Sequence, residues 1–376
     1  MTPLSVLHVT DASSSGVLVA VTTIARQQSL DPRFDRVVFA YVLRPDSPSH
    51  AEIEALAGPG VTVRRWSEQL SAARLFALAR SLRRTLRSED FDVVHLHSSR
   101  AGLIGRWVAL MTPHRRRSVY SPHAFAFAYD HWSAGRRFVL WALELLGAVA
   151  GGRFVLNSRS EQTIAGRAFP WARTAVLVNA VDVERLRRLA STPDAGQPWF
   201  AHIGRIAPAK APALFAEVAA IVRGRVPAAR GRWLGEGDRE LLEDSSGAVE
   251  VSGWLPPDEL HERLATASAL LFTSRGEGMP MAVLEAQAMG IPVVASRVTG
   301  VVDLIDDGEN GLFGESAEEL ADALTRVLTE PELSGDLRRR TAEAAARFDQ
   351  TATAQHSLDA YGSLLPAVRR ELGGAS

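Results

Sequence analysis

Several residue types are absent or scarce in this 376-residue chain, and each absence removes a class of function. There is no cysteine, which excludes a disulfide framework, a thiolate metal site and a thiol nucleophile. Acidic residues (43) and basic residues (42) balance, so nothing suggests a polyelectrolyte partner such as nucleic acid. The longest apolar run, Phe138 to Ala150, is too short to span a bilayer. Without an amino-terminal signal pattern, we expect a cytoplasmic protein.

Lysine is the scarcest charged residue. Lys210 is the sole lysine among the 42 basic residues. Lysine and arginine differ where a compact point charge must fit beside a phosphate. Composition alone therefore makes Lys210 a candidate functional residue, with an incidental surface lysine as the alternative.

Short apolar runs alternate with helical patterns along the chain, and this predicts parallel, doubly wound α/β sheets. The length exceeds one typical core and predicts two domains. We expect domains at 1–190 and 191–350, the second opening after a turn-rich linker at 191–198, and a last helix at 351–376. After Gly311 only helical patterns are apparent. The runs expected to be strands lie at 4–9, 37–43, 61–63, 93–97, 118–121, 154–157, 175–178, 199–203, 232–234, 249–253, 269–273 and 291–296.

One βαβ unit stands out, because a polar turn and a helix over 274–290 separate two of these runs. Such a turn lies at the carboxyl end of a strand, where open α/β sheets bind ligands. Glu277 lies in the turn and Glu285 eight residues later, about 12 Å away if both were helical. Paired glycosidase carboxylates need roughly 5–9.5 Å. The spacing therefore suits binding the two ends of an extended ligand better than cleaving one bond. The alternative is an ordinary turn with two solvated glutamates.

This stretch, with Gly290–Ser296 and Asp307–Leu312, resembles the E-x(7)-E motif of the glycogen-synthase-like retaining glycosyltransferases, family 4. The resemblance implies the GT-B fold, two Rossmann-like domains facing across a cleft, with the donor on the second domain. It also implies that Glu277 approaches the donor sugar and that Glu285 holds the ribose hydroxyls. Pro280 has no N–H, so the amides expected to face an anionic donor are those of Met279, Met281 and Ala282.

Two further stretches of the second domain match the family. Gly204 to Lys210 is not a P-loop, because Ala209 and Ala211 replace the required residues. It resembles the family's glycine-arginine…lysine element, in which Arg205 and Lys210 would neutralise the donor diphosphate. The family's next two turns line the base and ribose. They place Gly235, Trp254 and Leu255 at the donor, with core packing as the alternative for Trp254.

The first domain offers weaker matches. Gly16 lies in a Ser/Gly turn that resembles the family's glycine-rich first loop at the donor phosphates, although Ser15-Gly16 replaces paired glycines. A plain capped helix start is the alternative there. Pro122 ends a strand just before His123, which places His123 at the functional edge of the sheet. The stretch resembles the family's threonine-proline-histidine-glycine loop, with Ala124 in place of glycine.

His95 and His97 share one face of a strand. No third metal ligand lies nearby in sequence, so no metal is expected. The resemblance instead implies that His97 and Ser98 line the acceptor side.

Arginines cluster in the predicted helix 72–88 and at 115–117. Such a basic surface can contact anionic lipid, and a solvated arginine-rich face is the alternative.

The reaction implied by the resemblance moves a hexose, with retention, from a nucleoside diphosphate sugar to an acceptor hydroxyl. We expect UDP as the nucleotide, GDP second, and neither metal nor other cofactor. The catalytic residues would be His123, Arg205, Lys210 and Glu277. The acceptor would be a lipid-linked glycan, a polysaccharide precursor or a small metabolite. A nucleotide-sugar epimerase and a catalytically silent binding protein of the same architecture are the alternatives.

Overall fold

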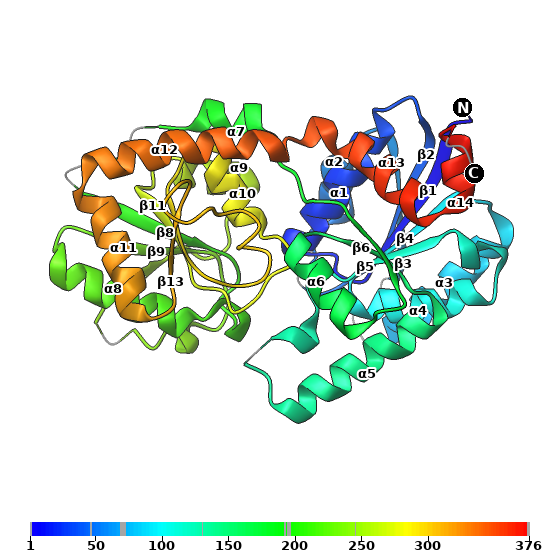
Figure 1. The fold of residues 1–376 in the computed structure, drawn as a ribbon, viewed down its shortest axis with the longest axis horizontal. Coiled ribbons are helices and arrows are strands. Elements are labelled where there is room, and N and C mark those ends of the chain that lie inside the picture. Colours follow the sequence, from blue (N-terminus) through cyan, green and yellow to red (C-terminus); the bar gives the residue numbers. More distant parts are fainter. Residues whose placement is uncertain are drawn as a thin grey trace. The chain divides into compact units, whose positions relative to one another are not determined.

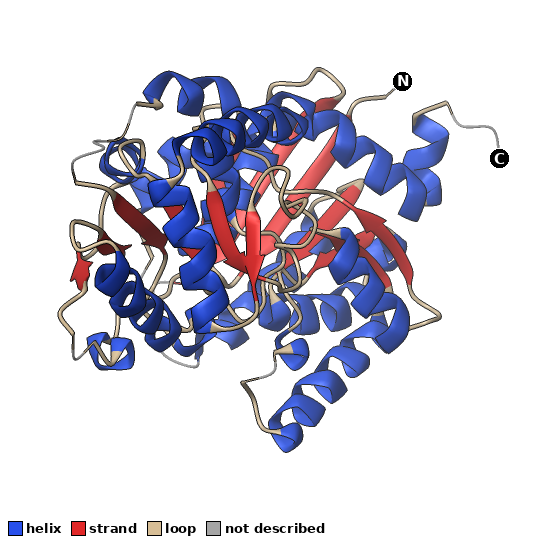
Figure 2. Ribbon diagram, turned by 60° about the vertical axis from the view of Figure 1, so that its left-hand side comes forward, coloured by secondary structure: helices blue, strands red, loops and turns tan. Residues whose placement is uncertain are grey.

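The computed structural model describes residues 2–45, 47–67, 73–129, 131–191, 193, 197–244 and 246–373, apart from the side chains of Ser15 and Arg74. Contacts divide the chain into two units. Unit 1 comprises Met1–Ala128, Trp132–Ala180 and Gln350–Ser376, and unit 2 comprises Tyr129–His131 and Val181–Asp349. Each unit is a parallel sheet covered by helices (Figures 1 and 2), which confirms the predicted fold class.

The sheet of unit 1 has seven parallel strands in the order β3-β2-β1-β4-β5-β6-β7. The strands are β1 (Leu4–Thr10), β2 (Phe34–Val42), β3 (Val61–Ser67), β4 (Val93–His97), β5 (Ser118–Ser121), β6 (Arg153–Leu156) and β7 (Arg173–Val176). The strand order reverses between β1 and β4. That switch point is where doubly wound sheets open a crevice at their carboxyl ends.

Helices cover both faces of this sheet. They are α1 (Ser15–Ser29), α2 (His50–Ala57), α3 (Ala73–Ser88), α4 (Ser99–Leu110), α5 (Ala134–Ala150), α6 (Arg159–Ala168), α13 (Thr353–Leu364) and α14 (Pro366–Glu371). Successive residues of β1 supply both cores: Val6 packs in the core that contains α1 and α13, and Leu7 packs in the core that contains α3 and α4. Most positions of a strand buried on both faces are apolar, which explains why β1 is apolar everywhere except at Ser5, His8 and Thr10.

The sheet of unit 2 has six parallel strands in the order β10-β9-β8-β11-β12-β13. The strands are β8 (Trp199–Ile203), β9 (Arg230–Leu234), β10 (Val249–Val251), β11 (Ala269–Phe272), β12 (Val293–Ser296) and β13 (Leu312–Gly314). The helices are α7 (Val183–Leu189), α8 (Pro212–Arg225), α9 (Pro257–Leu264), α10 (Met281–Ala288), α11 (Ala317–Thr329) and α12 (Pro331–Ala345).

The expectation that only helix follows Gly311 is wrong, because Leu312–Gly314 forms edge strand β13. A three-residue strand shows no period in the sequence. Pairing with β12 creates it.

The chain returns to unit 1 for its last residues. Helix α13 packs against α1 and β7 (Figure 1), while α7 packs against α9 and α10. The contacts therefore divide the chain at Ala180/Val181 and Asp349/Gln350. The boundary expected at 190/191 falls beyond α7, and most of the expected linker at 191–198 lies outside the described residues.

Candidate functional site

Two loops meet at the carboxyl ends of β8 and β11 in unit 2. The Arg275 N–H donates a hydrogen bond to the Ala209 carbonyl oxygen over 2.9 Å. The Thr273 hydroxyl donates to the Lys210 carbonyl oxygen over 3.0 Å. These bonds tie the loop after β8 to the turn after β11, so stretches more than sixty residues apart in sequence form one site.

Lys210 and Glu277 form an ion pair in this site. The Lys210 Nζ donates to Glu277 Oε1 over 2.5 Å, and the two side chains are 24% and 17% exposed. The ammonium also lies 5.4 Å from the centre of the Phe272 ring. The lysine singled out by composition and the glutamate singled out by the motif therefore share one contact.

Glycine is required where these loops approach β9. Gly235 has φ +150°, and a Cβ there would lie 2.1 Å from the Gly204 carbonyl oxygen. That same oxygen accepts a 2.7 Å hydrogen bond from Nε1 of Trp233, so it cannot move away freely. The Gly-x-Gly sequence at Gly235 thus marks a close approach of two backbones.

Arg205 and Trp254 extend the surface of this site. Arg205 is exposed on the loop after β8. Gly253 has φ +77° and pairs with Gly235, and it is followed by Trp254, which is 64% exposed. The alternative in which Trp254 packs in the core is therefore excluded. Leu255 is half-buried.

Helix α10 directs its first amides out of its amino end. Its first backbone bond is donated by Leu284 to the Pro280 carbonyl oxygen, so the N–H groups of Met281 and Ala282 precede the helical ladder. Such amides favour anionic groups. Met279, the third predicted donor, has a buried side chain.

Glu285, on the same helix, lies beside His261 of α9. The Nε2 of His261 is 3.4 Å from Glu285 Oε1, and its Nδ1 is 3.3 Å from Nη1 of Arg185. Arginine can only donate, so Nδ1 accepts and the Nε2–H of the imidazole faces Glu285. The histidine thus lies beside this carboxylate, an arrangement for which the sequence held no signal.

In unit 1, β5 ends at Ser121 and leads into a turn of unusual backbone. His123 has φ 59° and Ala124 has φ 118°, a conformation that favours glycine. The Ala124 N–H donates to Glu161 Oε1 over 2.9 Å, and Glu161 is fully buried. Ala124 thus keeps a glycine-like backbone despite its Cβ. Burial lowers the pKa of His123 to about 4, so its imidazole is neutral at pH 7.

The predicted acceptor residues lie behind and beside His123. His97 is fully buried, and its Nδ1 is 2.9 Å from His123 Nε2. Ser98 has φ 70° and donates its hydroxyl hydrogen bond to Asp11. Gly16, which was predicted to contact the donor phosphates, is exposed at the second position of α1.

A third histidine joins His95 and His97. The ring nitrogens of His8, His95 and His97 include a set lying within 4.8 Å of one another. Sequence reasoning missed His8 because it lies on β1, which pairs with β4 so that His8 is opposite His95. Every ring nitrogen of the three already has a protein partner, so the cluster is a hydrogen-bonded core.

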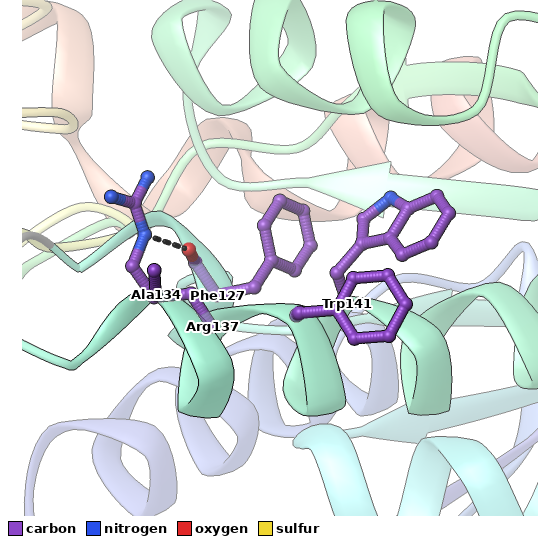
Figure 3. A pocket seen from close by; sticks show the side chains of 5 residues that line it. Phe127, Ala134, Arg137 and Trp141 are labelled. Atoms are coloured by element: carbon purple, nitrogen blue, oxygen red, sulfur yellow. Dashed lines mark hydrogen bonds between the residues drawn. The ribbon is translucent and has the colours of Figure 1, made fainter.

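Helix α5 of unit 1 carries a separate apolar surface (Figure 3). A pocket there is lined by Phe127, Ala134, Arg137, Phe138 and Trp141. The Nε of Arg137 donates to the Phe127 carbonyl oxygen over 3.1 Å. In the described part of the chain, no helix is long and apolar enough to cross a membrane.

Comparison with known proteins identifies both units. Residues 15–185 match the model of Glycosyltransferase Family 4, and residues 197–330 match that of Glycosyl transferases group 1. The chain is 31% identical to a D-inositol 3-phosphate glycosyltransferase of Saccharomonospora viridis, over 88% of this chain and 85% of the relative. It is 27% identical to UDP-Gal:alpha-D-GlcNAc-diphosphoundecaprenol alpha-1,3-galactosyltransferase of Escherichia coli, over 66% and 69%.

Solved structures agree on the fold. Anabaena HepE in complex with UDP and glucose has a TM-score of 0.76 at 18% identity, covering 96% of this chain and all of that one. Sucrose-phosphate synthase from Thermosynechococcus elongatus has a TM-score of 0.80 at 17% identity, with the same coverage. These are GT-B proteins, and the two doubly wound sheets described above have that fold. The chain belongs to the family 4 glycosyltransferases and is a nucleotide-sugar-dependent glycosyltransferase.

Proposed function

We propose that this glycosyltransferase transfers a hexose with retention of configuration from a UDP-sugar, with GDP-sugar as the second choice, to an acceptor hydroxyl. The observation that carries the proposal is the contact between Lys210 and Glu277. It brings a cation suited to a diphosphate and a carboxylate suited to a sugar to the same strand ends. UDP is preferred because HepE is described with UDP and glucose, and the E. coli relative with UDP-Gal.

The proposed chemistry takes place on one face of the sugar. The bond from the anomeric carbon to the diphosphate oxygen breaks, and the acceptor oxygen bonds to the same face. The acceptor proton passes to the departing diphosphate. Arg205, Lys210 and the first amides of α10 would stabilise the charge that develops on that diphosphate, usually a dominant contribution to catalysis. His123 and Glu277 would position the sugar, and the proposal assigns no metal.

Donor binding tests the first half of this proposal. A specific ligand raises the melting temperature by mass action, so UDP and UDP-hexoses should raise it more than GDP, GDP-hexoses or free hexoses. The variant Lys210→Ala should lose most of this shift. A larger shift with guanosine nucleotides would overturn the preference for UDP, and equal small shifts with every nucleotide would overturn the donor assignment.

The product tests the second half. With an α-linked donor, NMR of the product should show an α-linked glycoside. A β-linked product would overturn retention. In the absence of acceptor, a nucleotide-sugar epimerase would convert the donor into its epimer, whereas a transferase should leave the sugar's configuration unchanged. A protein that binds donor yet never turns it over with any acceptor would favour the silent binding alternative.

We also propose that unit 1 contacts an anionic membrane surface, which would suit a lipid-linked acceptor. Helix α5 exposes large apolar side chains along its length, at Phe138, Val139, Leu143, Leu146 and Val149. Arg136 and Arg137 lie in its first turn, and its one acidic residue, Glu144, is buried in an ion pair with Arg106. Exposed apolar area beside cations is the pattern of an interfacial helix.

The arginine-rich helix named from the sequence lies in the same layer. Helix α4 packs against both α3 and α5, and the side chains of Arg80, Arg83, Arg84 and Arg87 on α3 are exposed. Each such cation contributes on the order of 1 kcal/mol near an anionic surface.

Vesicle sedimentation tests this surface. The protein should bind vesicles that contain anionic lipid more tightly than neutral ones, and Phe138→Ser with Val149→Ser should weaken binding about tenfold. Leu30→Ser, at a residue 68% exposed elsewhere on unit 1, is the control. Equal loss in the control, or no binding to either vesicle, would overturn the proposal.

A further inference from the structure

A continuous chain of hydrogen bonds runs from His123 into the buried core of unit 1. Its members come from six strands or helices and from the turn after β5. In order they are His123, His97, His8, Gln28, Tyr361, His95, Ser121 and the carbonyl group of Val155. Successive donor–acceptor distances from His123 to Ser121 lie between 2.8 and 3.1 Å. Histidine, glutamine, tyrosine and serine can each donate and accept, so their chemistry alone does not set a direction.

The direction is set at the far end, where the carbonyl oxygen of Val155 can only accept. The single hydroxyl hydrogen of Ser121 is used in that bond. Ser121 must therefore accept from Nε2–H of His95. Because burial keeps His95 neutral, with its pKa well below the usual value, its Nδ1 carries a lone pair. That lone pair accepts the hydroxyl hydrogen of Tyr361.

The same reasoning continues toward His123. Tyr361 has donated its hydrogen, so its oxygen accepts from the amide NH₂ of Gln28. The amide oxygen of Gln28 then accepts from Nε2–H of His8. The Nδ1 of His8 accepts from Nε2–H of His97.

One step remains. The Nδ1 of His97 accepts from Nε2–H of His123. Every bond in the chain thus points away from His123.

We propose that this chain holds His123 as the Nε2–H tautomer and so makes its Nδ1 a hydrogen-bond acceptor for a hydroxyl of the bound sugar. His97, His8 and Tyr361 act as positioning residues for His123. This inference rests on the proposed function for the identity of the ligand, but the tautomer itself is a property of the free protein.

Two observations support the assignment. Burial lowers the pKa of His8 and of His123 to about 4, so both are neutral at pH 7 and have one lone pair each. Among the described residues, no hydrogen bond reaches Nδ1 of His123, whereas both ring nitrogens of His97 and of His8 are bonded. A ligand hydroxyl can donate a hydrogen bond to that nitrogen. An ether oxygen or a fluorine can only accept, and so does not match it.

Nitrogen NMR of protein labelled with ¹⁵N-histidine tests the tautomers directly. His8, His97 and His123, assigned by single His→Gln variants, should each show protonated Nε2 and unprotonated Nδ1 at pH 7. A His123 signal with protonated Nδ1, or with both nitrogens protonated, would overturn the proposal. Because no donor is present, this result does not depend on the proposed function.

The variant Tyr361→Phe tests the direction of the chain at a distance. It removes the hydroxyl between Gln28 and His95, so the segment from Gln28 to His123 loses its fixed polarity, and the His123 signals should become those of mixed tautomers. The control Tyr41→Phe removes a buried tyrosine hydroxyl of the same unit that bonds His50, outside the chain. It should leave the His123 signals unchanged. An unchanged His123 in Tyr361→Phe, or equal change in the control, would overturn the proposal.

Kinetics then link the tautomer to the sugar. Tyr361→Phe should lower kcat/KM for the donor about tenfold, with the melting-temperature shift by UDP alone unchanged. If UDP does not bind the wild-type protein, the proposed function fails while the NMR result stands. If UDP binds and turnover is unaffected in a variant with mixed tautomers, the role of Nδ1 fails while the proposed function stands.

Discussion

The two units have the same architecture, but the side chains at the carboxyl ends of their strands differ in charge. In unit 1 the polar groups at the carboxyl ends of β1, β4 and β5 form an uncharged chain of histidines whose pKa values burial holds low. In unit 2 the ends of β8 and β11 carry a charged pair, Lys210 with Glu277. A neutral, oriented group suits recognition of hydroxyls, and a cation suits stabilisation of a diphosphate. Architecture therefore supplies the location, and side-chain charge supplies the role.

The largest effect should come from removing the charge in unit 2. Lys210→Ala should lower kcat about 10²- to 10³-fold, the cost of losing one donor to a developing anion. Lys210→Arg should recover little, because a planar fork replaces a compact ammonium. Arg263→Ala, at a half-exposed arginine of the same unit, is the control for turnover and circular dichroism. Near-normal turnover of Lys210→Ala would contradict the assigned role.

Lowering the pH should destabilise unit 1 more than unit 2. In unfolded protein histidine binds a proton below about pH 6.5, while His8 and His123 do so only near pH 4 in the folded state. Above about pH 6.5 these low pKa values therefore cost no stability. As the pH falls toward 4, they lower the free energy of unfolding, by a few kcal/mol in total at pH 5.

In the described part of unit 2, burial lowers the pKa of His202 to about 3. Hydrogen exchange by mass spectrometry at pH 7 and pH 5 should show the core strands of unit 1 losing more protection than those of unit 2. A uniform loss across both units would contradict the expectation.

The glycine at the close approach in unit 2 should tolerate no side chain. Gly235→Ala should destabilise the protein by about 2–3 kcal/mol, because its Cβ would collide with the Gly204 carbonyl oxygen. Gly224→Ala is the matched control, since Gly224 lies in α8 with open space around its Cβ position. That change should stabilise the helix by about 0.5–1 kcal/mol. Denaturant unfolding measures both, and similar values would exclude the collision.

The reverse substitution, alanine to glycine, should stabilise the protein when made in unit 1. Ala124→Gly relieves a left-handed backbone at φ 118° and should raise the free energy of unfolding by about 1 kcal/mol. The control Ala79→Gly, inside helix α3, should lower it by a similar amount. Destabilisation by Ala124→Gly would show that the loop gains more from the alanine methyl than it loses to strain.

The sequence predicted most of the fold, because strands buried on both faces leave short, mostly apolar runs such as Leu4–Val9. It did not predict β13, whose three residues have no detectable period. The single lysine and the spacing of Glu277 were sufficient to single out the residues that form the contact in unit 2.

The hydrogen-bonded chain could not be predicted in this way. His8 lies within the mostly apolar run of β1, and nothing local distinguishes it. Gln28 and Tyr361 lie 333 residues apart. Strand register and the return of the last helix bring these residues together, and neither is encoded in local spacing. The exposure of Trp254 likewise depends on the turn at Gly253 and not on its residue type.

The segment that forms most of unit 2 begins and ends at the same spot. The Val181 N–H bonds the Phe348 carbonyl oxygen over 3.0 Å, and Val181 forms a parallel bridge with Asp349. A segment whose two ends adjoin can be cut out or grafted without stretching the remaining chain. Val181–Asp349 can therefore be exchanged between related chains, and hybrids that keep unit 1 while replacing this segment would show which unit determines the donor.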